Sequence, residues 1–291
     1  MAAFERSCRD EVEALKPGNV HVHADGHGMT VDHFLRSAAA AAPPLCVCGA
    51  SVGARVLGAV RASFSTVGLN ANLGIVLLCA PLAAAAERAA MQHEAPADRA
   101  SAALALRAAL AHTLAALDVA DAQAAFEAIR IASPGGLGAA SRHDVREPAA
   151  ATLREAMREA AARDMVARQY AHDFEDVLAV GLRALEAARA ADVRAPWLAS
   201  VVHMTFLARF DDSHVARKFG PARAAALREE AAALQEALQA CARPADFAGE
   251  LMAFDARLKG RGLNPGTTAD LTVASLFADR LIDLIARDND D

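Results

Sequence analysis

The sequence predicts an all-α fold in which residues 1–291 form a single multi-helix bundle, and three observations support this prediction. First, 54% of the residues are hydrophobic but only 4% are aromatic, and much of the apolar content is alanine, which favours closely packed helices. Second, the runs of Val, Ile, Tyr and Phe that are typical of strands are scarce. Third, no linker is long or polar enough to separate two domains.

In the first half of the chain, polar segments divide the sequence into helices. Pro17 and Gly18 end the first helix, because proline cannot continue it. Thr30, Asp98 and Asp118 are suitable N-cap residues for later helices. We therefore expect helices at residues 4–15, 30–42, 46–63, 73–86, 98–117 and 118–131.

In the second half, glycine-rich and charged segments separate the helices. Ser133–Gly138 is a strong break that the polar stretch to Pro148 extends, and residues 211–220 form a charged connection. We expect helices at residues 148–169, 174–191, 196–210, 221–242 and 244–258. A last helix follows the segment 262–270 and ends near residue 286, before an acidic tail.

Composition and charge narrow the partners and the location. The net charge of -6 argues against non-specific nucleic-acid binding. The longest apolar run, residues 73–86, contains Pro81 and is too short to span a bilayer, so we expect a buried helix and no membrane contact. No signal peptide is visible, and five cysteines, an odd number, fit free thiols in a reducing cytoplasm. Faces rich in alanine and glycine are compatible with a homodimer.

Rare residues concentrate in the polar segments between the helices. Only three of the 30 basic residues are lysines, and Lys16 and Lys218 both lie in such segments. Asparagine favours turns and caps in any protein, which explains part of its clustering here. We nevertheless expect the polar loops to converge on one pocket at one end of the bundle, with both lysines near phosphate groups. Four of the five asparagines lie in these loops: Asn19, Asn70, Asn72 and Asn264.

The loop at residues 16–29 contains three histidines, His21, His23 and His27. The spacing of these histidines differs by one inserted glycine from the spacing in the metal-binding loop of metallo-β-lactamase-like hydrolases. A metal-dependent hydrolase is therefore one alternative function. That fold needs strands before the motif, and this sequence does not supply them. A loop that holds phosphates or a hard cation, with Asp25 or Asp32 as a ligand, is favoured. In the interpretation that needs no ligand, these histidines are ordinary loop residues exposed to solvent.

The segment Asn264–Asp270 has two interpretations. Thr267 or Thr268 can cap the last helix, and Asp270 then lies in the first turn, where the helix dipole favours a carboxylate. That would explain these residues without any ligand. Alternatively, the N–H groups from Gly266 onwards cradle phosphate oxygens while Asp270 binds Mg²⁺.

Taken together, these residues resemble a known family, the triphosphoribosyl-dephospho-CoA synthases, over most of the chain. The family is all-α, in agreement with the composition. The resemblance rests on five motifs: Lys16-Pro-Gly18, Gly26-His27 with Met29 and Asp32, Thr66-x-Gly68-x-Asn70-x-x-x-Gly74, residues 214–220, and Asn264-Pro-Gly-Thr-Thr-Ala-Asp270. The last of these motifs is the most specific.

The resemblance implies a transferase that joins ATP and dephospho-CoA. The 2′-hydroxyl of dephospho-CoA attacks the ribose C1′ of ATP, adenine leaves, and no phosphate bond is broken. The catalytic residues would then be Asp270, Asp32 and His27, and the two aspartates would bind Mg²⁺ or act as the base. Phosphates, ribose and base would be held by Lys16, Gly18, Asn70, Arg217, Lys218, Asn264, Gly266 and Thr267.

Two departures from the family pattern bear on the acceptor. Members acting on citrate or malonate lyase usually read Gly-Leu-Val-Asp where this chain has Gly18-Asn-Val-His21, and His-Lys where it has Asn72-Leu73. The pattern is more similar to a branch found in archaea and methylotrophic bacteria, which shares the Ser133–Gly138 break. An alternative function is therefore a related ATP-dependent enzyme of one-carbon cofactor biosynthesis, of the methanopterin or methanofuran type.

Overall fold

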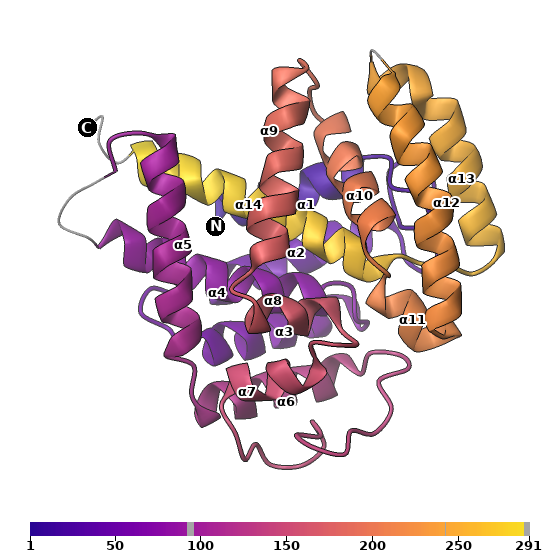
Figure 1. Cartoon of the computed structure of the whole chain (residues 1–291). Helices are drawn as coiled ribbons and strands as arrows, with labels where there is room; N and C mark the ends of the chain where they lie inside the picture. Colours follow the sequence, from indigo (N-terminus) through magenta and orange to yellow (C-terminus); the bar gives the residue numbers. More distant parts are fainter. Residues whose placement is uncertain (92–95, 242, 288–291) are drawn as a thin grey trace.

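The chain folds into helices joined by short connections (Figure 1). The computed structural model describes residues 1–91, 96–241 and 243–287, and the expected acidic tail lies outside them. Within these ranges the only extended pairing is two isolated bridges in the first polar loop, His21 with Ala24 and Gly26 with Met29. The prediction of an all-α fold is confirmed.

Six helices form the first part of the chain, and three begin at the expected caps. Thr30 forms a capping box with His33. Asp98 and Asp118 each accept a hydrogen bond from the backbone N–H three residues later. The helices are α1 (Ala2–Glu13), α2 (Val31–Leu45), α3 (Val52–Val67), α4 (Leu73–Ala90), α5 (Arg99–Ala115) and α6 (Val119–Ala132).

The remaining helices are shorter or broken more often than the sequence predicts. One segment is a π-helix and another is a 3₁₀ turn. In chain order they are α7 (Leu153–Ala160), α8 (Met165–Ala171), the π-helix η1 (Asp176–Gly181), α9 (Leu182–Ala190), α10 (Trp197–Arg209), α11 (Ser213–Phe219), α12 (Pro221–Ala240), the 3₁₀ turn η2 (Pro244–Phe247), α13 (Ala248–Gly260) and α14 (Gly266–Arg287).

Several expected boundaries are wrong: α2, for example, continues through Pro43 and Pro44 to Leu45. Helix caps explain three of the other differences. α3 begins only after Ser51, whose hydroxyl accepts from the N–H of Ala54 at 3.2 Å. The expected helix at 148–169 is two helices, because Asp164 accepts from the N–H groups of two residues in α8 and starts that helix anew. The connection 211–220 contains helix α11, which Asp212 caps through a 3.0 Å bond from the N–H of Val215.

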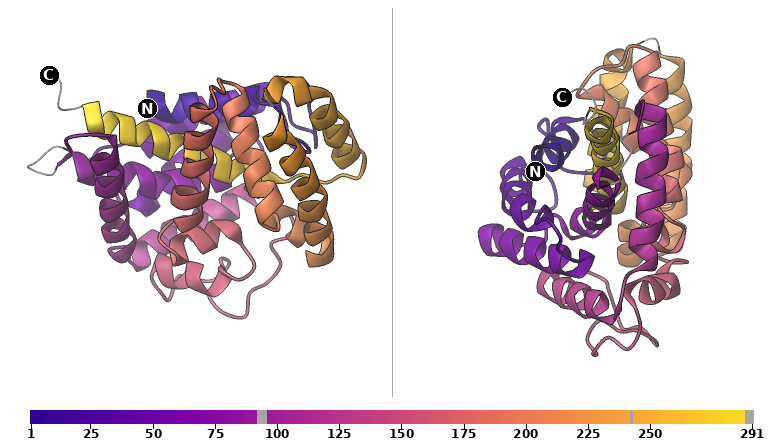
Figure 2. Two further views of the ribbon diagram at one scale, coloured as in Figure 1. Left: turned by 45° about the horizontal axis from the view of Figure 1, so that its top comes forward. Right: turned by 90° about the vertical axis from the view of Figure 1, so that its left-hand side faces the viewer.

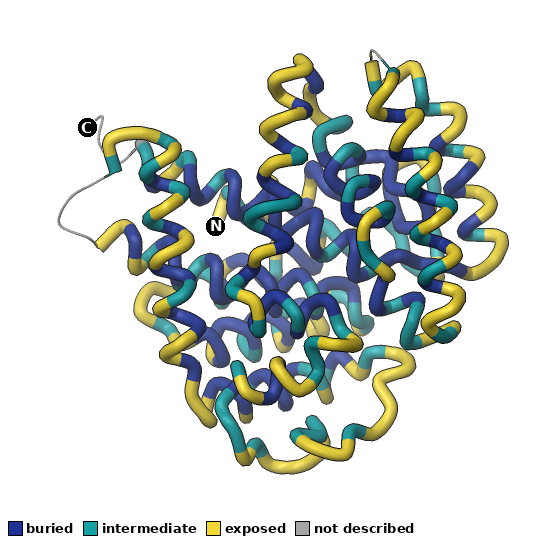
Figure 3. Tube along the Cα trace, viewed as in Figure 1, coloured by how far each residue is buried: buried dark blue, intermediate teal, exposed yellow. Residues whose placement is uncertain are grey.

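Helix α14 lies at the centre of the molecule. It packs against α1, α4, α5, α10 and η1. The N-terminal helices α1 to α3 lie on one side of it, and α9, α10, α12 and α13 lie on the other (Figure 2). Buried positions are concentrated along α4 and α14, and exposed ones along the outer helices (Figure 3). Helix α14 is therefore held by neighbours along much of its length, which fixes the position of the groups that it carries.

Two apolar clusters stabilise this arrangement. The larger one surrounds α4 and α14 and includes residues from α1 to α10. The smaller one joins α10, α12 and α13 to the end of the first helix and includes Leu15, Met204, Leu227, Phe254 and Leu258. Segments from both clusters meet at the N-terminus of α14. A single domain over residues 1–291 stays a prediction.

Helix α4 is long and apolar enough, by length and composition, to cross a membrane. Within the described residues, α5 and α6 pass the same test only as a pair, and they are bent by 92°. Because 61% of α4 is buried inside the protein, and core helices have the same composition, its apolar character is a weak indication of a span. Helix α4 is therefore the buried core helix that the sequence predicts.

Candidate active site

A cavity of about 1120 Å³ opens where α4, α11 and α14 begin. We call it the main cavity. Its wall comes from polar breaks that are far apart in the sequence, together with Glu11, Asn19 and Met29 from the start of the chain. The predicted convergence of the polar loops on one pocket is therefore confirmed. The other contributing segments are 70–75, 133–145, 159–168, 209–217 and 264–270.

Asp270 is one of the carboxylates in this wall. It is the fifth residue of α14, so the expectation that it lies in the first turn is wrong. It is partly exposed, and its carboxyl group contacts the backbone of Gly74 at the start of α4 so closely that no side chain fits between them. Burial raises the pKa of Asp270 well above its usual range, and the negative charges of Asp212, Glu11 and Asp164 raise it further. Asp270 is therefore a carboxyl group with increased affinity for a proton.

Asp212 joins the N-termini of α11 and α14. One of its oxygens accepts from the N–H of Val215, and the other accepts from the N–H and hydroxyl of Thr268 at 2.8 and 2.9 Å. The side chain is 2% exposed. Because one carboxylate caps both helices, the segments that carry Asp270 and Arg217 are fixed relative to each other.

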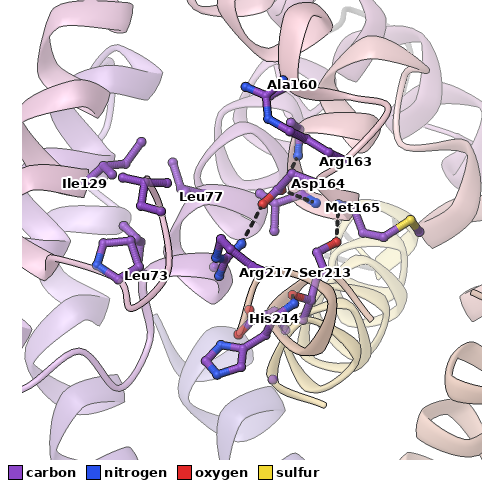
Figure 4. Close-up of a pocket in the computed structure, with 18 of the residues that line it drawn as sticks. Leu73, Leu77, Ile129, Ala160, Arg163, Asp164, Met165, Ser213, His214 and Arg217 are labelled. Atoms are coloured by element: carbon purple, nitrogen blue, oxygen red, sulfur yellow. Dashed lines mark hydrogen bonds and ion pairs between the residues drawn. The ribbon is translucent and has the colours of Figure 1, made fainter. Parts of the chain in front are cut away.

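Arg217, on α11, reaches into the main cavity and pairs with Asp164 at 3.0 Å (Figure 4). Its Nε lies 3.4 Å from the carbonyl oxygen of Gly135 in the long glycine-rich loop. Arg217 is one of several arginines in the lining, and its guanidinium lies beside Asp164, where a negatively charged ligand could contact it. An arginine fork is suited to bidentate contact with phosphate oxygens.

His214, one turn before Arg217 on the same helix, also lines the cavity (Figure 4). Burial, and then the charges of Arg217 and Lys218, lower its pKa to about 4. The imidazole is therefore neutral at pH 7 and adds no positive charge. Its backbone N–H donates to the hydroxyl of Thr267 at 3.2 Å, which ties α11 to α14 a second time.

Six of the residues expected from the sequence line the main cavity. Asn70 caps the start of α4, where its side-chain oxygen accepts from the N–H of Leu73 at 3.2 Å. The phosphate cradle expected at the start of α14 is mostly used internally, because the N–H of Gly266 donates to the carbonyl oxygen of Asn264 and that of Thr268 donates to Asp212. The six residues are Asn70, Arg217, Asn264, Gly266, Thr267 and Asp270.

Lys16 and Gly18 lie behind the cavity wall. The ammonium group of Lys16 is fully buried and donates to Glu11, Asn19 and the carbonyl oxygen of Val20. All three of its N–H bonds are used, so the expected direct contact between Lys16 and phosphate is not available. Gly18 has φ +83°, and a side chain there would lie 2.7 Å from Pro265. It is required for close packing, not for ligand contact.

Three more expected residues lie outside the lining. Asp32 has a side chain 68% exposed and pairs with Arg36 at 3.4 Å, so the expected pair of Asp32 and Asp270 around one Mg²⁺ is not formed. His27 is exposed and bonds to the carbonyl oxygen of Gly18 at 2.9 Å. Lys218 is exposed at the edge, beside the lining residue Gly135.

The histidine loop does not form the metal site of a hydrolase. His21 is buried 3.3 Å from Asp255, whereas His23 is exposed and His27 faces a backbone carbonyl. Within the described residues, no three His, Cys, Asp or Glu side chains are grouped so that they could hold a metal ion. The hydrolase alternative therefore loses the ligand set on which it rested.

Sequence reasoning missed three acidic residues at the site. Asp164 falls inside an expected helix, and only the cap it forms reveals the break. Glu11 lies on α1, whose apolar pattern gives no indication of a polar cavity. Asp212 was visible only as part of a charged connection. Asp164 and Asp212 are N-caps of short helices, and their residue type, which is favoured at N-caps, is the one signal that they share.

The fold and the cavity define an all-α protein with a large site, lined by both polar and apolar residues, of a size suited to nucleotide-sized ligands. The family model of the ATP:dephospho-CoA triphosphoribosyl transferases matches residues 1–288. The crystal structure of a protein from Archaeoglobus fulgidus, provisionally named a triphosphoribosyl-dephospho-CoA synthase, superposes with a TM-score of 0.62 and 25% identity. The match covers 86% of this chain and 98% of that one. No curated protein matches the chain in sequence.

The chain belongs to the family of ATP:dephospho-CoA triphosphoribosyl transferases. Enzymes of this family move the triphosphoribosyl group of ATP to dephospho-CoA, and this chain is a transferase of that kind. ATP is thus a substrate, and the bond that breaks is the one between the ribose and adenine. The family resemblance inferred from the sequence motifs is confirmed over nearly the full length.

Proposed function

We propose that the transfer takes place in the main cavity and that Asp270 is the carboxylate beside the reacting ribose. The observation that supports this best is the position of Asp270 in the wall, with a raised pKa and with Arg217 close enough to lower it. A carboxylate of increased basicity is suited to take a proton near neutral pH. The same charge stabilises an oxocarbenium-like ribose as adenine leaves.

The reaction balances without breaking a phosphate bond. The 2′-hydroxyl oxygen of the acceptor forms a bond with C1′ of ATP, and the bond between C1′ and adenine breaks. The hydroxyl proton passes to Asp270, and the departing adenine takes up one proton, so no net proton is consumed. Because the imidazole of His214 is neutral, other groups must balance the negative charge of the triphosphate.

Arg217 is the proposed phosphate ligand inside the cavity, and Lys218 supplies a second positive charge at its edge. Binding of phosphate oxygens to Arg217 competes with its ion pair to Asp164. Thr267, on the same helix as Asp270, and Asn70, in the turn before α4, line the same cavity and are proposed to contact the ribose or base. His27, Gly18 and Asp32 are not assigned a contact, because they lie outside the lining.

Mg²⁺ is proposed to enter with ATP, bound by the substrate phosphates and by water. Asp270 is not assigned to the metal, because a carboxylate bound to Mg²⁺ loses the proton affinity on which the proposed proton transfer depends. The oxygens of Asp212 are used by two helix caps, and those of Asp164 by a helix cap and Arg217. When bound, Mg²⁺ would offset the charge of the triphosphate.

Leu73 supports a second class of acceptor substrate. It lines the cavity where members acting on citrate or malonate lyase carry a lysine, so this wall holds one positive charge fewer. Such a wall is better matched to a less anionic acceptor. The second candidate is therefore a precursor of a one-carbon cofactor of the pterin or furan type, with the same triphosphoribosyl donor.

The test is a reaction of the purified protein with ATP, Mg²⁺ and dephospho-CoA, followed by mass spectrometry of the products. We expect free adenine and a triphosphoribosylated acceptor in equal amounts, and loss of both when EDTA removes Mg²⁺. Adenine formed only with pterin- or furan-type acceptors would select the second candidate. Formation of ADP or inorganic phosphate without adenine would contradict the proposed reaction.

A further inference from the structure

Lys16, Asn19 and Asn264 form a chain of hydrogen bonds that joins the first polar loop to the start of α14. Lys16 Nζ donates to Asn19 Oδ1 at 3.0 Å, and Asn19 Nδ2 donates to Asn264 Oδ1 at 2.8 Å. All three side chains are buried, and the two asparagines line the main cavity. The chain thus connects a charge behind the wall with an amide in the wall.

The ammonium group fixes the direction of both amides. Lys16 Nζ is surrounded by three acceptor oxygens, from Glu11, Asn19 and Val20, and a protonated amine has three N–H bonds and no lone pair. Asn19 must therefore turn its oxygen to Lys16 and its NH₂ group to Asn264. Because two NH₂ groups cannot bond to each other, Asn264 turns its oxygen to Asn19 and its own NH₂ group away.

The NH₂ group of Asn264 is left to face the cavity. It forms no hydrogen bond with any residue in the described ranges, although Asn264 is only 6% exposed. Because this donor has no partner within the described residues and Asn264 lines the cavity, an acceptor atom of a ligand can bond to it. Gly266 and Asp270, which follow on the same segment, line the same wall.

We propose that Lys16 and Asn19 are positioning residues that make Asn264 a hydrogen-bond donor to an oxygen of the triphosphoribosyl group of ATP. The identity of this ligand rests on the proposed function. Lys16 then acts on the nucleotide through two amides and not by direct contact. An acceptor group in the ligand is bound, and a donor group is rejected, because the ammonium cannot accept a hydrogen bond.

The isosteric change Asn19→Asp tests the direction of the chain. One oxygen of the new carboxylate still accepts from Lys16, but the other now accepts from Asn264, whose amide must turn and present its oxygen to the cavity. We expect the Kd for ATP, measured by calorimetry with Mg²⁺ present, to rise about tenfold. The melting temperature reports whether folding is retained.

A double-mutant cycle separates this effect from a direct repulsion by the new charge. In an Asn264→Ala background there is no amide to turn, so Asn19→Asp should change the Kd for ATP by less than about twofold. An equal change in the two backgrounds would overturn the inference while the wild type still binds ATP. No ATP binding by the wild type would overturn the proposed function as well.

A second variant covers the case in which Asn19→Asp does not fold. Asn264→Asp keeps the acceptor for Asn19 but replaces the NH₂ group that faces the cavity by an oxygen. We expect it to weaken ATP binding at least as much as Asn264→Ala does, because it removes the donor and adds repulsion. Binding of ATP by Asn264→Asp as tight as that of the wild type would overturn the inference.

Discussion

A methyl group on Gly74 would lie 2.6 Å from the carboxyl carbon of Asp270, and closer still to one of its oxygens. The first turn of α4 and the second turn of α14 therefore meet at the carboxylate, with no room for a side chain between them. This contact joins the polar turn before α4 to the last motif of the chain. It fixes the position of the group to which we assign the proton transfer.

Replacing Gly74 by alanine should reverse the usual effect of that substitution. In a helix, Gly→Ala normally stabilises by about 1 kcal/mol, but here the methyl group must push the carboxylate of Asp270 aside. We expect a loss of about 1–3 kcal/mol in the free energy of unfolding, from overpacking, and at least a tenfold lower kcat. Urea unfolding and adenine release measure the two effects.

Gly249→Ala is the matched control for that change. Gly249 lies on α13, is exposed, and a side chain there would meet nothing within 4 Å. It should leave kcat unchanged and keep or slightly raise the stability. Full kcat in Gly74→Ala would show that the carboxylate does not need its present position.

Arg217→Met should weaken ATP binding more than it slows the chemical step. An arginine–phosphate hydrogen bond is charge-assisted and contributes about 1.5–3 kcal/mol, so its loss should raise the KM for ATP about tenfold or more. Steady-state kinetics at several salt concentrations should show a weaker salt dependence in the variant. Arg36→Met, on an exposed part of α2, should behave as the wild type, and an unchanged KM in Arg217→Met would contradict the assignment.

His203 should make the protein less stable in acid. Burial, and then the charge of Lys16, lower its pKa to about 3, whereas an unfolded histidine has a pKa near 6.5. His21 lowers this pKa further, while Pro17 and Asp255 raise it. Between these two pKa values the unfolded state binds more protons, so stability is complete above pH 6.5 and falls as the pH decreases.

The variant His203→Gln removes this source of pH dependence. Between pH 7 and 5 its free energy of unfolding should fall by about 2 kcal/mol less than that of the wild type, at about 1.4 kcal/mol per pH unit below 6.5. His112→Gln, at an exposed position of α5, should keep the wild-type dependence. Equal slopes for His203→Gln and the wild type would mean that His203 does not stay neutral on folding.

Local sequence signals were sufficient for most of the helices and for half of the site. Asp98 and Asp118 cap helices as expected, since a cap needs only the residues around it. The break inside 148–169 and the helix inside 211–220 were missed because Asp164 and Asp212 are stabilised by partners distant in sequence, Arg217 and Thr268. The helix propensity of a short stretch of sequence contains no information on such distant partners.

Side-chain direction was the main quantity that the sequence did not give. Asn264, Arg217 and Asp270 were singled out by residue type, and they do line the cavity. Lys16 was singled out for the same reason, yet its charge points into the protein and meets Glu11. Which face of a loop is buried depends on packing against segments such as α13, more than 200 residues away, and the motif alone cannot determine it.

The most direct test of the central claim compares Asp270→Asn with Asp32→Asn. Both changes remove one carboxylate from a residue of the family motifs, but only Asp270 lines the main cavity. The measurement is the rate of adenine release at saturating ATP and acceptor. We predict a loss of about 10²–10⁴-fold for Asp270→Asn, with ATP still bound, and a rate within about twofold of the wild type for Asp32→Asn. The opposite order, or equal rates in the two variants, would contradict the assignment of this cavity as the active site.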